Sequence, residues 1–138
     1  MALTEIQSRR ATDEVSGASS GNGRHAVLIV DDDAGMIRLL TAILRTADYQ
    51  ICTANNGSDA LDVAQREHVD VIVLDLRMPV LDGPGFFREL RARGDTTPVL
   101  VTSSFGARDA QKELGAEGAI EKPFDPDDLL EAVGALLH

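Results

Sequence analysis

The sequence contains no tryptophan, one tyrosine and a single cysteine, Cys52. One cysteine excludes a disulfide framework and indicates a reducing compartment, so the fold has to depend on its apolar core. No apolar run approaches the roughly 20 residues that a membrane-spanning helix needs. The N-terminus also lacks the apolar segment of a signal peptide. We therefore expect a cytoplasmic protein with no membrane partner.

Basic residues are scarce as well. There are 13 Lys and Arg against 23 Asp and Glu, which gives a formal net charge of −10. A nucleic-acid surface needs clustered Lys and Arg to meet the phosphates, so we expect no nucleic-acid partner. A chain of 138 residues that is 43% apolar suits one domain with a compact core of aliphatic side chains.

The N-terminal segment differs in composition from the rest of the chain. Residues 16–23 read SGASSGNG, which is typical of a linker. We expect residues 1–24 to form a flexible tail and residues 25–138 to form the domain. A short helix that forms on a partner is the alternative for this tail.

After the tail, short apolar runs alternate with segments of helical periodicity. Five such units in strict alternation predict an α/β fold, with a five-stranded parallel sheet and helices on both faces. Right-handed crossovers leave few topologies, and 2-1-3-4-5 is the commonest strand order for five strands. Strands are predicted at 26–30, 49–54, 69–75, 99–102 and 118–121, and helices at 34–47, 58–67, from 83 onward, 107–114 and 126–137.

Several residues are suited to the ends of these helices. Asp33 precedes the first helix, and Ser58 is the expected N-cap of the second. Pro84 lies in the first turn of the third helix, where its missing N–H costs nothing. Gly115 is a natural C-terminal cap of the fourth.

The densest apolar run, VIVL at 71–74, ends directly in Asp75. A run this rich in β-branched residues is typical of a strand buried on both faces. Such a strand delivers the next side chain to the carboxyl edge of the sheet, where open α/β sheets build ligand sites. Taken alone, an aspartate that caps a turn accounts for Asp75 equally well.

Two more aspartates, Asp31 and Asp32, follow the first predicted strand. In the order 2-1-3-4-5, strands 1 and 3 are neighbours about 4.8 Å apart, so Asp31, Asp32 and Asp75 should crowd one site. Crowded carboxylates resist ionisation unless a cation lies among them. Oxygen ligands without His or Cys favour Mg²⁺. Helix capping is the alternative, and it accounts for Asp33 better than for the other two.

The same edge receives a hydroxyl and an amine. Ser103 follows the fourth strand and Lys122 follows the fifth. A lysine here can pair with the carboxylates and bind a phosphoryl group. Taken singly, Ser103 is more often a helix cap and Lys122 a surface lysine. Together with the three acids they indicate one site.

Several motifs follow one another in a characteristic order and spacing. They are Asp31-Asp32, Asp75 in VIVLDLRMP, Leu81-Asp82-Gly83, Ser103, Gly115-Ala116 and Lys122-Pro123-Phe124. In these motifs, over about residues 26–137, the sequence resembles the response-regulator receiver domains of two-component signalling, which have a flavodoxin-like fold.

The resemblance implies that Asp75 is the phospho-acceptor. It implies that Asp32 ligates Mg²⁺ directly, Asp31 largely through water, and Arg77 through its backbone carbonyl. Ser103 and Lys122 would bind the phosphoryl oxygens. The Lys-Pro bond would be cis. The implied donor is a sensor histidine kinase or a histidine phosphotransfer protein, and a downstream protein partner would bind the switched strand 4–helix 4–strand 5 face.

The chain departs from the family pattern in its switching region. Ala119 stands where the family usually has an aromatic residue, and the segment from Ser103 to Gly115 is about three residues short. We therefore expect that segment to reorder on phosphorylation, with Phe105 as the moving group. Phe105 as an ordinary loop residue is the alternative. No output domain is expected after Leu137, so we expect a stand-alone receiver.

Three other functions are alternatives to this one. A haloacid-dehalogenase-like phosphatase requires an acid two residues after the nucleophile, where this chain has Arg77. A flavodoxin-like cofactor binder requires a phosphate-cradling loop after strand 1, where aspartates would repel a phosphate. A degenerate receiver that acts only as a scaffold would not need all the site residues. The oligomeric state is left open.

Overall fold

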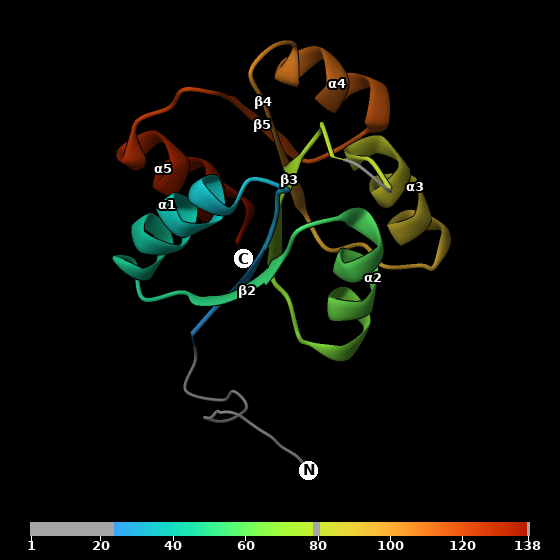
Figure 1. The fold of residues 1–138 in the computed structure, drawn as a ribbon, viewed down its shortest axis with the longest axis horizontal. Coiled ribbons are helices and arrows are strands. Elements are labelled where there is room, and N and C mark those ends of the chain that lie inside the picture. The colour runs from blue at the N-terminus through green and yellow to red at the C-terminus, as the bar shows by residue number, and fades with distance from the viewer. Residues whose placement is uncertain (1–23, 79–80, 138) are drawn as a thin grey trace.

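The computed structural model describes residues 24–78 and 81–137, and within them strands and helices alternate without exception (Figure 1). The predicted tail, apart from Arg24, lies outside the described residues. The strands are β1 (Ala26–Val30), β2 (Gln50–Ala54), β3 (Val71–Asp75), β4 (Val99–Ser103) and β5 (Gly118–Glu121). The helices are α1 (Ala34–Arg45), α2 (Gly57–Arg66), α3 (Gly83–Ala92), α4 (Ala107–Leu114) and α5 (Pro126–Leu136).

The five strands form one parallel sheet in the order β2-β1-β3-β4-β5, which confirms the predicted topology. The register decides which residues meet at its carboxyl edge. Val30 of β1 pairs with Leu74 of β3, so the next residues, Asp31 and Asp75, lie side by side at this edge. Asp75 itself pairs with Thr102 of β4.

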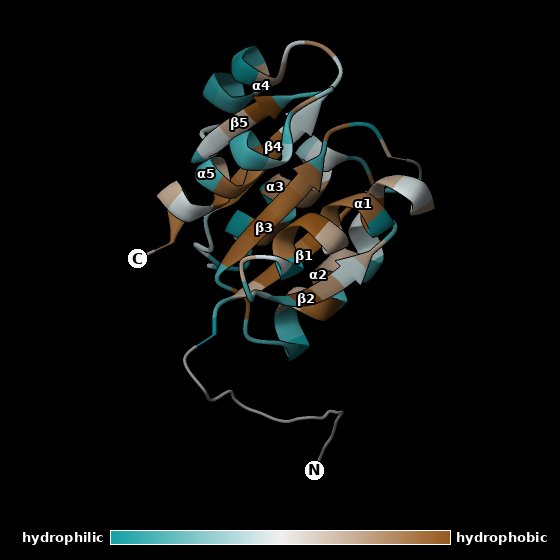
Figure 2. Cartoon of the chain, turned by 90° about the vertical axis from the view of Figure 1, so that its left-hand side faces the viewer, coloured by the Kyte–Doolittle hydropathy of each residue, from teal (hydrophilic) through white to brown (hydrophobic). Residues whose placement is uncertain are grey.

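Helices cover both faces of the sheet, with α1 and α5 on one side and α2, α3 and α4 on the other (Figure 1). Alternate residues of each central strand face opposite layers. In β1, Val27 and Ile29 pack in the core beneath α1 and α5, whereas Leu28 and Val30 pack in the core beneath α2 and α3. Figure 2 shows the central strands β1 and β3 as the most hydrophobic part of the fold. This is why their sequences read as unbroken apolar runs.

The predicted helix ends are mostly confirmed. Asp33 caps α1, where its Oδ1 accepts the N–H groups of Gly35 (2.8 Å) and Met36 (3.3 Å). Gly115 ends α4 with a left-handed φ of 80°, which glycine adopts without strain. The helix α1 ends at Arg45, two residues before the predicted boundary.

The predicted N-cap of α2 was wrong. Asn56, not Ser58, caps this helix, because its extended backbone lets Oδ1 accept the N–H of Asp59 at 2.8 Å. The helix therefore begins at Gly57, one residue earlier than predicted. This shift matters because it brings Gly57 against the loop that follows β3.

None of the helices in the described parts of the chain combines the length and the apolar character that a membrane crossing requires.

Candidate functional site

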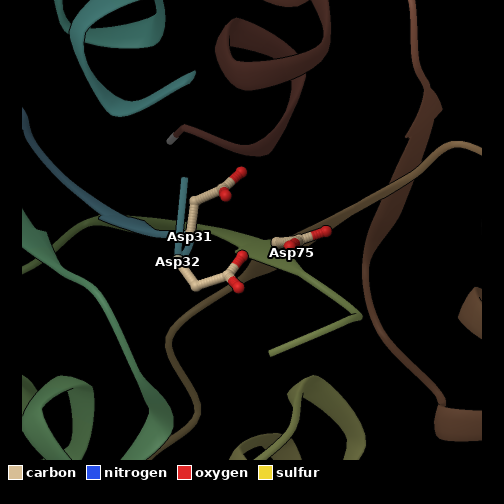
Figure 3. A group of neighbouring side chains, drawn as sticks. All are labelled: Asp31, Asp32 and Asp75. Atoms are coloured by element: carbon tan, nitrogen blue, oxygen red, sulfur yellow. The ribbon is translucent and has the colours of Figure 1, made fainter. Parts of the chain in front are cut away.

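Three carboxylates converge at the carboxyl edge of the sheet (Figure 3). Asp31, Asp32 and Asp75 each offer an oxygen, and these oxygens all lie within 4.8 Å of one another. Asp31 is 1% exposed and Asp75 is 7% exposed, whereas Asp32 is open to solvent. The register between β1 and β3 brings them together, as the strand order predicted.

Lys122 joins the two buried carboxylates. Its Nζ lies 3.2 Å from Oδ2 of Asp31 and 3.4 Å from Oδ1 of Asp75. The lysine is aimed inward by the turn after β5, where the Lys122–Pro123 peptide bond is cis as the resemblance implied. Its backbone N–H donates to the carbonyl of Ser103 at 2.8 Å. One ammonium thus pairs with two of the three carboxylates.

The two aspartates after β1 differ in whether their carboxylate oxygens are free to bind a ligand. Asp31 is occupied at both oxygens, because Oδ1 accepts the N–H of Asp33 at 2.9 Å and Oδ2 accepts from Lys122. Asp32 receives no hydrogen bond from any residue in the described ranges. Its oxygens are therefore the most available to a cation.

Burial raises the pKa of Asp75 above its ordinary value, and the charge of Asp31 raises it further. Lys122 and a hydrogen bond from the backbone of Arg77 offset part of this rise. The site therefore carries more negative charge than its own lysine balances. A hard divalent cation fits this donor set, which contains carboxylate oxygens and neither imidazole nor thiolate.

Ser103 lies at the same edge, but its hydroxyl does not reach the carboxylates. The side chain is 4% exposed at the end of β4. Oγ donates to the carbonyl of Phe105 at 2.9 Å and accepts the N–H of Phe105 at 3.2 Å. The hydroxyl is therefore bound within its own loop. The sequence predicted correctly that Ser103 lies at the carboxyl edge of the sheet, but it did not predict the orientation of the hydroxyl.

Arg77 follows β3, and its side chain is exposed. The loop that carries it returns to α3 through Leu81 and Asp82, while residues 79 and 80 lie outside the described ranges. One contact of this loop was not expected from the sequence. The N–H of Gly57, at the start of α2, donates to the carbonyl of Leu81 at 3.2 Å. Asn55-Asn56-Gly57 is a turn motif, and such a motif does not specify which distant backbone the turn contacts.

Two other features do not belong to the site. An open cavity of about 470 Å³ between α1 and α2, lined among others by Ile37, Asp59 and Arg66, contains none of the three carboxylates. Cys52 is a free thiol on β2, and burial raises its pKa to about 11. A thiol with so high a pKa is mostly protonated at neutral pH and therefore a poor nucleophile.

Comparison with known proteins agrees with this geometry. Residues 27–134 match the family model described as the response regulator receiver domain. The transcriptional regulatory protein PrrA of Mycobacterium tuberculosis is 40% identical over 115 residues, which cover 81% of this chain and 49% of that protein. The chain spans about half the length of the curated relatives it matches.

Solved structures show the same fold. The chemotaxis protein CheY4 of Vibrio cholerae superposes with a TM-score of 0.77 at 32% identity, over 83% of this chain and 100% of that chain. The response regulator TrrA of Thermotoga maritima, determined in complex with Mg²⁺-BeF, superposes with a TM-score of 0.75 at 29% identity, over 82% of this chain and 99% of that chain. The chain therefore belongs to the response regulator receiver domain family.

Proposed function

We propose that this receiver domain accepts a phosphoryl group on Asp75 with the help of a bound Mg²⁺. The observation that carries the proposal is the position of Lys122, whose Nζ bridges the buried carboxylates of Asp31 and Asp75 beside the open carboxylate of Asp32. A lysine held among acids at the carboxyl edge of a sheet suits the binding of an anionic group to one of those acids.

The Mg²⁺ ligands that we propose are Asp32, Asp75 and the backbone carbonyl of Arg77, with Asp31 contributing largely through water. The hydrogen bonds already made by Asp31 and the availability of Asp32 support this division. When bound, Mg²⁺ would reduce the repulsion among the carboxylates and stabilise charge on the phosphoryl oxygens.

In the proposed reaction, a carboxylate oxygen of Asp75 attacks the phosphorus of a phosphohistidine on a sensor histidine kinase or a histidine phosphotransfer protein. A P–O bond to Asp75 forms as the P–N bond to the donor breaks, and the electron pair leaves with the imidazole, which takes up a proton. Lys122 is already beside Asp75 and would bind one phosphoryl oxygen. Ser103 would bind another after releasing Phe105.

The product places new charge at the ends of β3, β4 and β5. Ser103 links this charge to the loop before α4, since its hydroxyl holds the backbone of that loop. We propose that the β4–α4–β5 face changes and binds a downstream protein. The cytoplasmic location stays a prediction. The phosphatase hypothesis remains disfavoured by Arg77, which stands where that class needs an acid.

The decisive experiment is phosphorylation by acetyl phosphate in the presence and absence of Mg²⁺, followed by intact-protein mass spectrometry. The wild-type protein should gain one acid-labile phosphoryl group that requires Mg²⁺. Asp75→Asn keeps the shape of the side chain and removes the attacking oxygen, so it should gain none. Asp62→Asn changes an exposed aspartate of α2 and should behave like the wild type. Labelling of Asp75→Asn at the wild-type rate would refute the proposal.

A further inference from the structure

The first turn of α2 lies in backbone contact with the loop that follows Asp75. The N–H of Gly57 donates to the carbonyl of Leu81 at 3.2 Å. A Cβ atom at position 57 would lie 2.5 Å from that carbonyl oxygen and 2.8 Å from the Cβ of Leu81. The backbone of Gly57 is not in the left-handed region. The close approach to Leu81, and not a conformational need, is therefore what requires glycine here.

The other end of the same loop is tied equally closely to α3. The N–H of Gly83 donates to the carbonyl of Leu76 at 3.3 Å. A Cβ at position 83 would lie 2.7 Å from both the carbonyl oxygen of Asp75 and the Cα of Leu76. The N–H of Leu76 also donates to the carbonyl of Thr102 in β4 at 3.1 Å. The loop is thus anchored at Leu76 by its own β–α unit and by β4.

Leu81 is held between two helices. On the α3 side, a Cβ at position 85 would lie 2.8 Å from Cδ1 of Leu81, which is the end of a flexible side chain. On the α2 side, the atom nearest to an added Cβ at position 57 is the backbone carbonyl oxygen of Leu81. This oxygen cannot move without moving the loop. Gly57 belongs to a different β–α unit, and it therefore restrains the backbone of this loop from outside the loop's own unit.

We propose that Gly57 is a positioning residue for the Mg²⁺ site, acting through Leu81 on the carbonyl of Arg77. The inference rests on the proposed function, in which that carbonyl is a metal ligand. Leu81 is two residues before Gly83, and the N–H of Gly83 is bonded to the carbonyl of Leu76, the residue directly before Arg77. An alanine at position 57 would force the contact with Leu81 to open from 2.5 Å to at least 3.0 Å. Because Mg²⁺ demands near-ideal octahedral geometry, a displacement of this size at a ligand lowers its affinity.

The test compares Gly57→Ala with Gly134→Ala. Gly134 lies in α5 with nothing within 4 Å of an added Cβ, so its variant is a matched glycine-to-alanine control in a helix. Mg²⁺ affinity is measured by titration of backbone amide resonances. We expect the Kd for Mg²⁺ to rise roughly three- to tenfold in Gly57→Ala and to stay unchanged in Gly134→Ala. The rate of phosphorylation by acetyl phosphate should fall at low Mg²⁺ and return toward the wild-type rate at saturating Mg²⁺.

A purely structural defect would lower the folded fraction measured without Mg²⁺ and would leave the Kd of the folded molecules at the wild-type value. A folded Gly57→Ala variant with the wild-type Kd would overturn the inference. If the variant fails to fold, an Mg²⁺ titration of the wild-type protein tests the inference instead. Its Gly57 amide resonance should shift with the same Kd as the amides of the site, and the absence of that shift would overturn the inference. If the wild type neither binds Mg²⁺ nor accepts a phosphoryl group, the proposed function itself fails.

Discussion

The hydroxyl of Ser103 is bonded twice to Phe105, donating to its carbonyl and accepting its N–H. The pair forms a closed turn at the end of β4, and Phe105 is 83% exposed. Gly106 follows with a left-handed φ of 74° and then α4 begins. For Ser103 to bind a phosphoryl oxygen, this turn has to open. The proposed phosphorylation of Asp75 would therefore change the local structure before α4.

Phosphorylation is predicted to change hydrogen exchange mainly between Ser103 and Gly115. Opening of the Ser103–Phe105 turn releases the start of α4, a helix of 8 residues that buries only Ala107 fully. Short, lightly packed elements open most easily. Amide exchange with and without Mg²⁺ and beryllofluoride would measure this, with Asp75→Asn as the control that should show no change. Equal protection of the segment in both states, with changes confined to β5 and α5, would contradict the prediction.

Most of the fold could be predicted because its signals are local. The apolar runs of the strands and the periodicity of the helices identify every β–α unit in the described ranges, and strict alternation then fixes a parallel sheet. The meeting of Asp31, Asp32, Asp75 and Lys122 follows from strand order alone, since each residue ends a strand or lies within two residues of a strand end. No knowledge of side-chain rotamers is needed to place them at one edge.

The features that could not be predicted depend on distant or competing partners. The hydroxyl of Ser103 could face Asp75 or its own loop, and the sequence does not distinguish the two. Asn56 and Ser58 are both good capping residues, and the sequence does not show that Asn56 is the one whose Oδ1 accepts the N–H of Asp59. The pairing of Arg91 with Glu117 spans 26 residues and leaves no periodic pattern.

Arg91→Met is predicted to lower the free energy of unfolding by about 1–3 kcal/mol. The guanidinium donates to the carbonyls of Asp95 (2.9 Å) and Thr97 (3.0 Å) and lies over the ring of Phe87 at 4.5 Å. Methionine would leave those carbonyls without their donor. The ion pair with the partly exposed Glu117 adds less, because solvent screens it.

Urea denaturation would measure the loss for Arg91→Met, and Arg93→Met provides the control. Arg93 lies on the same turn of chain but is bonded to exposed side chains, among them Glu89 at 3.2 Å. Its replacement should change stability by no more than about 0.5 kcal/mol. Equal losses for the two variants would show that the backbone carbonyls bound by Arg91 contribute little.

Asp32→Ala is predicted to weaken Mg²⁺ binding more than Asp31→Ala does. The carboxylate of Asp32 has no hydrogen bond from any described residue, whereas both oxygens of Asp31 are engaged. Ligand binding raises stability by about 1.4 kcal/mol for each tenfold excess of ligand over its Kd, so the rise in Tm with Mg²⁺ reports the affinity. Equal or reversed effects would mean that the proposed roles of the two aspartates are exchanged.

Asp75→Asn is predicted to raise the Tm by a few degrees at pH 7.5 without divalent cations. Burial and the charge of Asp31 raise the pKa of Asp75 in the folded state. A carboxyl whose pKa is raised on folding stabilises the protein while it is protonated at low pH, and this contribution is lost as the pH rises through the folded-state pKa. The wild type therefore carries a cost at neutral pH that asparagine, being uncharged, avoids.

The advantage of Asp75→Asn should shrink as the pH falls toward 4 and Asp75 of the wild type becomes protonated. It should also shrink or reverse in saturating Mg²⁺, because the cation compensates the wild-type charge and has one carboxylate fewer in the variant. Thermal unfolding across pH, with and without Mg²⁺, measures both dependences, and Asp62→Asn should show neither. A lower Tm for Asp75→Asn at pH 7.5 in the absence of Mg²⁺ would mean that its ion pair with Lys122 outweighs burial and the repulsion from Asp31.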